Sequence, residues 1–113
     1  MAYTHVQTFN PEILYAFDPL NEAGNYSKTH SHNFLEISIL LEGEADYLVD
    51  GERQDVGTGT VMLFNPGVKH AERQKEGTFS HQLHIGLTNV SLNGLPRNHF
   101  PNKIFDHPIL YTK

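Results

Sequence analysis

One stretch, Gly24 to Gly43, constrains the fold of this 113-residue chain more than any other. Its strongest polar side chains, His30, His32 and Glu36, all occupy even-numbered positions. Successive side chains of a β-strand point to opposite faces, so these three are expected to point the same way. The odd positions nearby are apolar, which predicts a strand from His32 to Leu41 that is covered on both sides.

The apolar face of this predicted strand has two interpretations. One is that it forms the back of a barrel and packs on a second sheet. The other is that part of it contacts a neighbouring subunit in a homodimer. We favour the first, because strands covered on both sides usually carry apolar residues of this kind. The face consists of Leu35, Ile37, Ile39 and Leu41.

The rest of the chain indicates an all-β, antiparallel fold. No segment has a sustained helical period, and short alternating runs are separated by turn residues. Asp50-Gly51 predicts a type I′ hairpin, and Glu42-Gly43 and Asn65-Pro66-Gly67 predict further turns. Residues 1–11 are expected to form an arm, and residues 88–113 a loop-rich tail. Further strands are predicted at Ile13–Asp18, Ala45–Val49, Glu52–Val56, Thr60–Phe64, Val68–Arg73 and Phe79–Leu87.

Composition narrows the class of protein. A chain of 113 residues suits a single domain with its own core. The absence of cysteine excludes disulfides and thiolate zinc sites, so any metal must be held by nitrogen and oxygen. A net charge of −5 disfavours nucleic-acid binding by this piece alone. With no signal peptide and no membrane-spanning run, we expect a soluble, cytoplasmic protein with no membrane partner.

The polar cluster needs a partner from elsewhere in the chain, and His70 is the best candidate. Three imidazoles and one carboxylate suit a divalent transition metal such as Mn, Fe, Ni, Cu or Zn. Two interpretations stay open for His30, His32, Glu36 and His70: they hold such a metal, or they line a polar cavity without one. His5, His99 and His107 are expected to lie on the surface.

These residues resemble the two cupin motifs. The first motif runs Gly, five residues, His, one residue, His, three or four residues, Glu, six residues, Gly, and every interval is met from Gly24 to Gly43. In the second motif Gly59, Gly67 and His70 fall in place. Asn65 occupies the usual proline position, and Gln74 replaces the usual asparagine. The resemblance implies a jelly-roll barrel, also called a double-stranded β-helix.

The departures resemble the N-terminal sensor domain of AraC-type transcription regulators. The resemblance is carried by Phe34–Glu44, Gly59–His70 and Phe79–Leu95. In that family a cupin barrel binds a small effector, often a sugar, and a C-terminal pair of helix-turn-helix units binds DNA. The resemblance therefore implies a sensor fragment of a longer protein, which contacts DNA only through a C-terminal domain absent from this chain.

Two further residues are predicted to contact a ligand. His81 lies between Phe79 and Leu83 on the apolar face of its predicted strand, so a buried imidazole there needs a partner. An effector hydroxyl or the backbone would serve equally. Phe34 is expected to stack on a sugar ring. Tyr15, Phe17 and Tyr47 share that possibility, although aromatic residues at strand spacing are more often core.

The leading hypothesis is a non-enzymatic sensor that binds a small polar effector, such as a carbohydrate, and whose arm orders when the ligand binds. The rival is a stand-alone metal-dependent cupin enzyme, an isomerase or a dioxygenase, that uses the same four residues as metal ligands. A carbohydrate-binding module without regulation is a third hypothesis. The sequence names neither the effector nor the metal.

Overall fold

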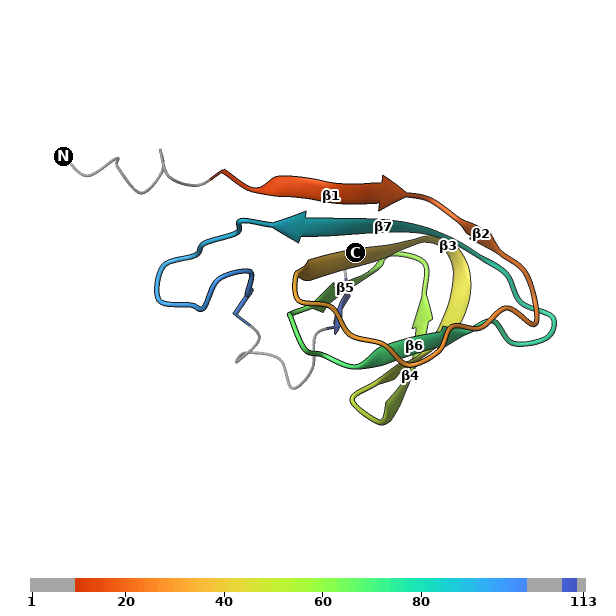
Figure 1. Cartoon of the computed structure of the whole chain (residues 1–113). Coiled ribbons are helices and arrows are strands. Elements are labelled where there is room, and N and C mark those ends of the chain that lie inside the picture. The colour runs from red at the N-terminus through yellow and green to blue at the C-terminus, as the bar shows by residue number, and fades with distance from the viewer. Residues whose placement is uncertain (1–9, 102–108, 112–113) are drawn as a thin grey trace.

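The computed structural model describes residues 10–101 and the backbone of residues 109–111. All regular structure in these residues is β, and every strand pairing between the elements is antiparallel, as predicted. No helix in the described residues is long and apolar enough to cross a membrane. The strands are β1 (Glu12–Phe17), β2 (Leu20–Asn21), β3 (Leu35–Val49), β4 (Glu52–Gly57), β5 (Thr60–Phe64), β6 (His70–Arg73), β7 (Ser80–Thr88) and β8 (Ile109–Tyr111) (Figure 1).

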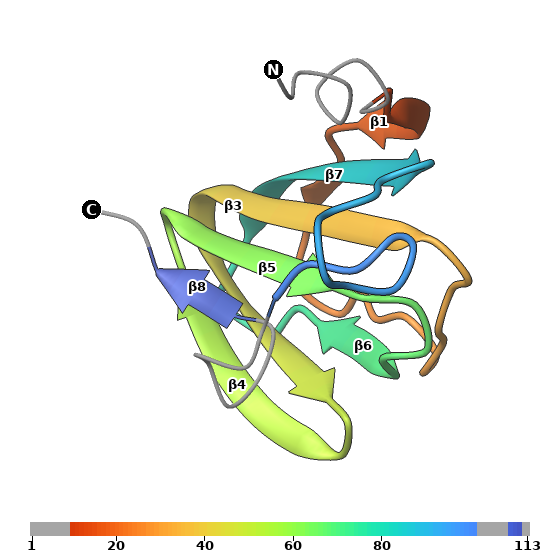
Figure 2. The ribbon, with the colours of Figure 1, turned by 90° about the vertical axis from the view of Figure 1, so that its left-hand side faces the viewer.

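The strand β3 belongs to both sheets of the barrel. Its first part pairs with β7 on one side and β5 on the other, within a sheet ordered β1-β7-β3-β5-β8. Its second part pairs with β4 and β6. Figure 2 shows β3 leaving its place between β5 and β7 and continuing toward β4. One continuous strand therefore joins the two sheets and closes the barrel around a shared interior.

The predicted turn at Glu42-Gly43 is wrong, because β3 runs through it. The ladder with β7 is shifted between Leu40 and Glu42, which marks a β-bulge. Gly43 has a φ of 92°, and a Cβ there would overlap the carbonyl oxygen of Phe79. Glycine thus lets two backbones approach closely while the strand bends from one sheet into the other.

The bulge also changes which residues of β3 face the interior. Before it Leu40 is buried, as are its even-numbered neighbours, and after it the odd-numbered Tyr47 and Val49 are buried. An extra residue on one strand shifts the alternation by one position. The strand also starts at Leu35, later than the predicted His32.

Other local predictions hold. Thr60–Phe64 has the predicted bounds, and Asp50 and Gly51 both have positive φ, as a type I′ turn requires. The predicted arm lies mostly outside the described residues. The loop-rich tail ends in β8, which pairs with β5 and was not predicted as a strand.

The interior divides into an apolar and a polar half. The apolar half packs the second part of β3 against β4 and β5. It is built on Leu40, Ala45, Tyr47, Val49, Val56, Met62 and Phe64, with Val68 at its margin. The polar half lies along β6 and β7, where every inward-facing side chain except glycine is hydrophilic.

The apolar outer face predicted for β3 is only partly covered. Leu35 is fully buried, but Ile37 and Ile39 are half-buried and Leu41 is 43% exposed. The expectation that the whole face packs on a second sheet is therefore wrong, because the second sheet covers the even-numbered face instead. A homodimer through this face stays a prediction.

The bend in β3 gives the first testable prediction. Gly24 and Gly43 have the same φ of 92°, but a Cβ on Gly24 would meet no atom within 4 Å. Gly24→Ala should therefore lower the free energy of unfolding only by the cost of placing alanine in a left-handed backbone conformation, about 1–2 kcal/mol. Gly43→Ala should cost about 1–3 kcal/mol more, the usual cost of overpacking. Urea unfolding measures both, and equal losses would contradict the close approach to Phe79.

Candidate metal centre

Four side chains predicted to form a site come together at one end of the barrel interior, where Glu36 and His70 are buried, His32 is half-buried and His30 is exposed. The donor atoms of His30, His32, Glu36 and His70 all lie within 4.8 Å of one another. Glu36 points inward from β3, and His70 is the first residue of β6. The two segments are joined where the backbones of His30 and His70 exchange two hydrogen bonds of 2.9 Å.

The reason for this convergence differs from the predicted one. His30 and His32 lie before β3, so strand alternation does not align them with Glu36. His30 is held by its bridge to His70, and the carbonyl of His32 accepts a 2.9 Å hydrogen bond from Gly67. The turn at Asn65-Pro66-Gly67 therefore positions one histidine directly and leads the chain to another.

Backbone carbonyls fix the tautomers of two of the histidines. Nδ1 of His30 lies 2.7 Å from the carbonyl oxygen of Lys28, and Nδ1 of His70 lies 3.0 Å from that of Val68. A carbonyl oxygen only accepts, so Nδ1 must carry the proton in both rings. In the neutral form of each ring Nε2 then carries a lone pair and no proton, which is the arrangement found in metal-binding histidines.

The Nε2 atoms of His70 and His32 face a carboxylate oxygen of Glu36, which is itself a hydrogen-bond acceptor. Nε2 of His70 is 3.1 Å from Oε1 of Glu36, and Nε2 of His32 is 3.7 Å from the same oxygen. The His32 nitrogen is buried and has no hydrogen-bond partner in the described structure. A carboxylate oxygen facing imidazole lone pairs is stable only with a proton or a metal ion between them. The donor set therefore fits a divalent transition metal.

The protonation states suit metal binding. Burial alone would raise the pKa of Glu36, but hydrogen bonds from His70 and Tyr15, together with the charges of His70 and His32, bring it below its usual value. Burial lowers the pKa of His32, as do His70 and His30, against the attraction of Glu36. An ionised carboxylate beside a neutral imidazole is the form that metals bind.

Two aromatic side chains pack around the cluster. Phe64 stacks on His70 with ring centroids 4.0 Å apart, and Phe34 stacks on His32 at 4.5 Å. The predicted ligand contact Phe34 thus packs against a candidate metal ligand and does not line the cavity. The hydroxyl of Tyr15 donates a hydrogen bond to Oε2 of Glu36. Burial, followed by Glu36, raises the pKa of Tyr15, so its hydroxyl keeps its proton.

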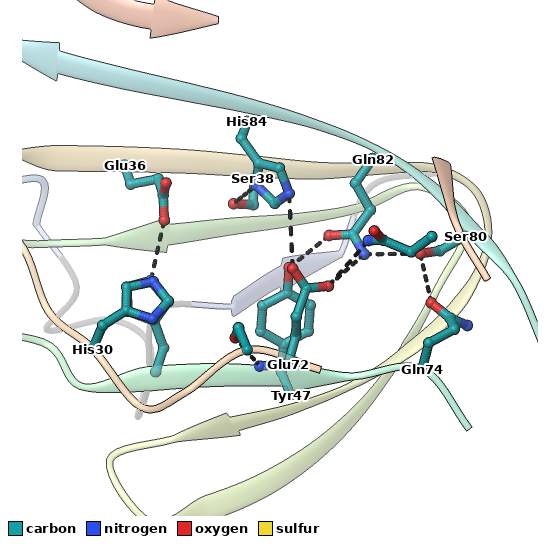
Figure 3. Close-up of polar contacts among 12 residues, drawn as sticks. His30, Glu36, Ser38, Tyr47, Glu72, Gln74, Ser80, Gln82 and His84 are labelled. Carbon is teal, nitrogen blue, oxygen red and sulfur yellow. Dashed lines mark hydrogen bonds and ion pairs between the residues drawn. The ribbon is translucent and has the colours of Figure 1, made fainter. Parts of the chain in front are cut away.

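A cavity of about 300 Å³ opens beside the cluster. Glu36 and His70 line one end, Glu72 and His84 line the other, and Tyr47 of β3 also lines the cavity. Oε1 of Glu72 lies 4.0 Å from Nε2 of His84. Figure 3 shows Glu72 and His84 pointing toward each other across the barrel interior, from β6 and β7. The pocket is thus polar at both ends.

A chain of hydrogen bonds fixes the far end of the cavity. Tyr47 donates to Oε1 of Gln82 at 2.6 Å, and Nε2 of Gln82 donates to Oε2 of Glu72 at 2.8 Å. The same Gln82 nitrogen donates to Ser80, which donates in turn to Gln74 (Figure 3). Glu72 therefore has one oxygen committed to this network and Oε1 directed at His84.

Sequence reasoning missed Glu72, Gln82 and His84 and misplaced His81. It took the apolar side of β7 as the inner face, whereas the polar side faces inward. His81 consequently lies on the outside, 35% exposed in its side chain, with Nε2 3.2 Å from Oδ2 of Asp18. The prediction of a buried, ligand-contacting His81 is wrong. The alternation itself was visible, and adjacency to Glu36 and Ser38 in the ladder decides which side is inward.

Comparison with known proteins identifies the family. The profile described as "Cupin domain" matches residues 20–79, more than half of the chain, and includes both halves of the cluster. The chain belongs to the cupin family. Among curated proteins, none is similar enough in sequence to be matched.

Solved cupin structures share the fold. A cupin protein from Bacteroides fragilis is 22% identical, with a TM-score of 0.60 over 76% of this chain and 70% of that chain. A predicted oxalate decarboxylase from Thermotoga maritima is 17% identical, with a TM-score of 0.62 over 81% and 76%. The polyketide cyclase RemF from Streptomyces resistomycificus is 17% identical, with a TM-score of 0.62 over 81% and 64%. At these identities the likeness shows the fold alone.

Burial of His84 predicts how stability depends on pH. Burial lowers the pKa of His84, against the attraction of Glu72 and Glu36, and His70 and His30 lower it further. The pKa of a histidine in an unfolded chain is about 6.5. Below that pH the unfolded chain binds more protons than the folded chain, so stability falls as the pH falls. His32 contributes with the same sign.

Urea unfolding in the presence of a chelator tests this from pH 7.5 to pH 5. His84→Asn should make the loss of stability on acidification shallower, by at most about 1.4 kcal/mol per pH unit, the value for one proton. A variant slope equal to that of the wild type would show that His84 does not titrate differently in the two states.

Proposed function

We propose that this cupin domain binds one divalent transition metal ion through His30, His32, Glu36 and His70, and a small hydroxyl-bearing molecule beside it. The observation that carries the proposal is the meeting of Oε1 of Glu36 with Nε2 of His70, 3.1 Å away, and Nε2 of His32, 3.7 Å away, where the buried His32 nitrogen has no hydrogen-bond partner in the described structure. When bound, such a metal supplies a Lewis acid that polarises a ligand oxygen. The protein orients that ligand and limits its size.

Metal titration of the chelator-treated chain tests the first half of the proposal. Calorimetry with Mn²⁺, Co²⁺ and Zn²⁺ should give one site, and His70→Ala should weaken it by at least about 100-fold, since even an outer-shell partner contributes 10–100-fold. His81→Ala, on the outer face, is the matched control and should keep the wild-type affinity. Absence of one-to-one binding, or equal affinity in His70→Ala, would refute the metal site.

The far end of the cavity supports a hydroxyl group as the feature that is recognised. The 4.0 Å separation of Glu72 Oε1 and His84 Nε2 is too long for a direct hydrogen bond, but one oxygen atom beside the gap can lie about 2.8 Å from both atoms. Oγ of Ser38 is 2.7 Å from Nδ1 of His84 and can donate to it. His84 then presents Nε2–H, so a hydroxyl accepts from His84 while donating to Glu72.

Charge supports a neutral ligand at this end. No lysine or arginine is among the described residues that line the cavity, whereas Glu36 and Glu72 both face it. A carboxylate or phosphate placed between Glu72 and His84 would meet an acceptor of its own charge. A carbonyl would leave the Glu72 oxygen without a donor. A neutral polyol, including a sugar, satisfies both groups.

Matched five-carbon probes test the ligand class. Xylitol carries hydroxyl groups and glutarate carries two carboxylates, so xylitol should shift the ring signals of His84 in NMR titrations of the metal-free protein, and glutarate should not. Glu72→Gln replaces the acceptor that faces the cavity and should weaken xylitol binding about tenfold or more, the usual value of a hydrogen bond to a charged group.

Glu76→Gln is the control for the second probe experiment, because it makes the same charge change at an exposed position away from this cavity. Glutarate binding equal to that of xylitol at His84, or an unchanged affinity in Glu72→Gln, would contradict a hydroxyl-reading site.

Within this proposal we assign the domain the role of effector sensor in an AraC-type regulator. Its support is the sequence resemblance in Phe34–Glu44, Gly59–His70 and Phe79–Leu95. A sensor releases its ligand unchanged, whereas a metal-dependent isomerase or dioxygenase converts it. NMR analysis of polyols and aldoses recovered after prolonged incubation with metal-loaded protein distinguishes the two. If the wild type converts a polyol or an aldose and His70→Ala does not, the domain is a metal-dependent enzyme and the sensor role is wrong.

A further inference from the structure

Two side chains of the first strand reach groups of the barrel interior: Tyr15 contacts Glu36, and Phe17 packs on His84. β1 pairs only with β7, at the edge of the larger sheet (Figure 1). Of its six residues, all of which the structure describes, only Tyr15 is not exposed. A register shift between Ile13 and Tyr15 marks a bulge, which re-aims the side chain that follows it.

Tyr15, Gly86 and Glu36 form one row across three neighbouring strands. Tyr15 of β1 is paired with Gly86 of β7, and Gly86 is paired with Glu36 of β3. Neighbouring strands are about 4.8 Å apart, so Tyr15 must extend across β7 to reach Glu36. It does so, because its hydroxyl donates to Oε2 of that carboxylate.

Gly86 is what allows the tyrosine to cross. A Cβ on Gly86 would overlap three atoms of the Tyr15 ring, Cδ2, Cε2 and Cζ. Gly86 does not have positive φ, so its backbone conformation does not require glycine. Glycine is required there because the Tyr15 ring occupies the space that a Cβ would fill. Glycine inside a strand usually marks such a close approach.

We propose that Tyr15 is a positioning residue for the metal centre, and that β1 completes this centre when it docks on β7. Tyr15 holds Oε2 of Glu36, which leaves Oε1 directed at the Nε2 atoms of His70, 3.1 Å away, and His32, 3.7 Å away. The inference rests on the metal site proposed above. It adds that a strand outside the barrel sets the orientation of the only carboxylate ligand.

Docking of β1 and metal binding should therefore favour each other. Binding that is strengthened by an ordered element stabilises that element by the same factor, because linkage is reciprocal. Tyr15 is the one residue of β1 that is not exposed, and its hydroxyl makes the hydrogen bond between β1 and the proposed ligand Glu36. Phe17, 51% exposed, lines the cavity and packs on His84 with ring centroids 5.2 Å apart, but the proposed ligand Glu36 is bonded by Tyr15.

Substitutions at the two ends of the crossing test the proposal in the 113-residue chain. Tyr15→Phe keeps the ring above Gly86 and removes only the hydroxyl, so Co²⁺ affinity should fall about 10–100-fold, the usual effect of losing an outer-shell partner. The visible absorption spectrum of bound Co²⁺ should change as Glu36 reorients. Gly86→Ala should produce a similar loss by displacing the ring.

The double variant separates positioning from general destabilisation. If Gly86→Ala acts through Tyr15, it should weaken Co²⁺ binding little further in the Tyr15→Phe background, so the two losses should not add. Tyr26→Phe and Gly57→Ala are matched controls, since Tyr26 is 74% exposed and a Cβ on Gly57 meets no atom within 4 Å. Both should retain wild-type affinity.

Amide hydrogen exchange gives a readout that does not depend on affinity. Co²⁺ should slow exchange in β1 of the wild type by about the factor that Tyr15→Phe costs in affinity, and should not slow it in Tyr15→Phe. Wild-type Co²⁺ binding with unchanged affinity and spectrum in Tyr15→Phe would overturn this inference alone. Absence of Co²⁺ binding in the wild type would overturn the metal site and this inference together.

Discussion

A β-bulge between Leu40 and Glu42, followed by a glycine pressed against the backbone of Phe79, determines what the interior of this barrel contains. Before the bulge, β3 turns Glu36 and Ser38 inward, and after it Tyr47 and Val49. Without the shift, the second part of the strand would turn Leu48 inward and expose Tyr47. One backbone irregularity thus places a polar half and an apolar half in the same interior.

The polar half is stable because nearly all of its buried groups bond to one another. Tyr47, Gln82, Ser80 and Gln74 form a directed chain in which each hydroxyl or amide has a partner. Burying such groups without partners would cost about 1–3 kcal/mol each. Against this background two places stand out: Nε2 of His32, which has no hydrogen-bond partner in the described structure beside Oε1 of Glu36, and Oε1 of Glu72, 4.0 Å from Nε2 of His84. The two ends of the cavity are where the network leaves capacity for a ligand.

Sequence alone predicted the fold class and the four residues of the cluster. The motif spacing carried this result, because the intervals from Gly24 to Gly43 and from Gly59 to His70 identify the family pattern. Strand alternation did not predict the cluster correctly, because His30 and His32 precede the strand. Backbone hydrogen bonds to His70 and Gly67 hold them instead. Such contacts between distant segments leave no periodic trace in sequence.

The missed features have a common cause. In β7 the apolar residues were assigned to the interior, as in most strands, whereas here the barrel interior is polar along β6 and β7 and the apolar residues face outward. His84, Gln82 and Glu72 were therefore overlooked, and His81 was placed inside. The crossing of Tyr15 over Gly86 needs the register of three strands, which only the structure supplies.

X-ray absorption spectroscopy of the Co²⁺-loaded chain shows whether the donor atoms at one end of the cavity hold a metal ion. A metal bound by these four residues should have a first coordination sphere of nitrogen and oxygen with the multiple-scattering signal of three imidazole rings, reduced to two rings in His70→Ala. A sphere made only of oxygen atoms, or an imidazole signal unchanged in His70→Ala, would contradict the metal site.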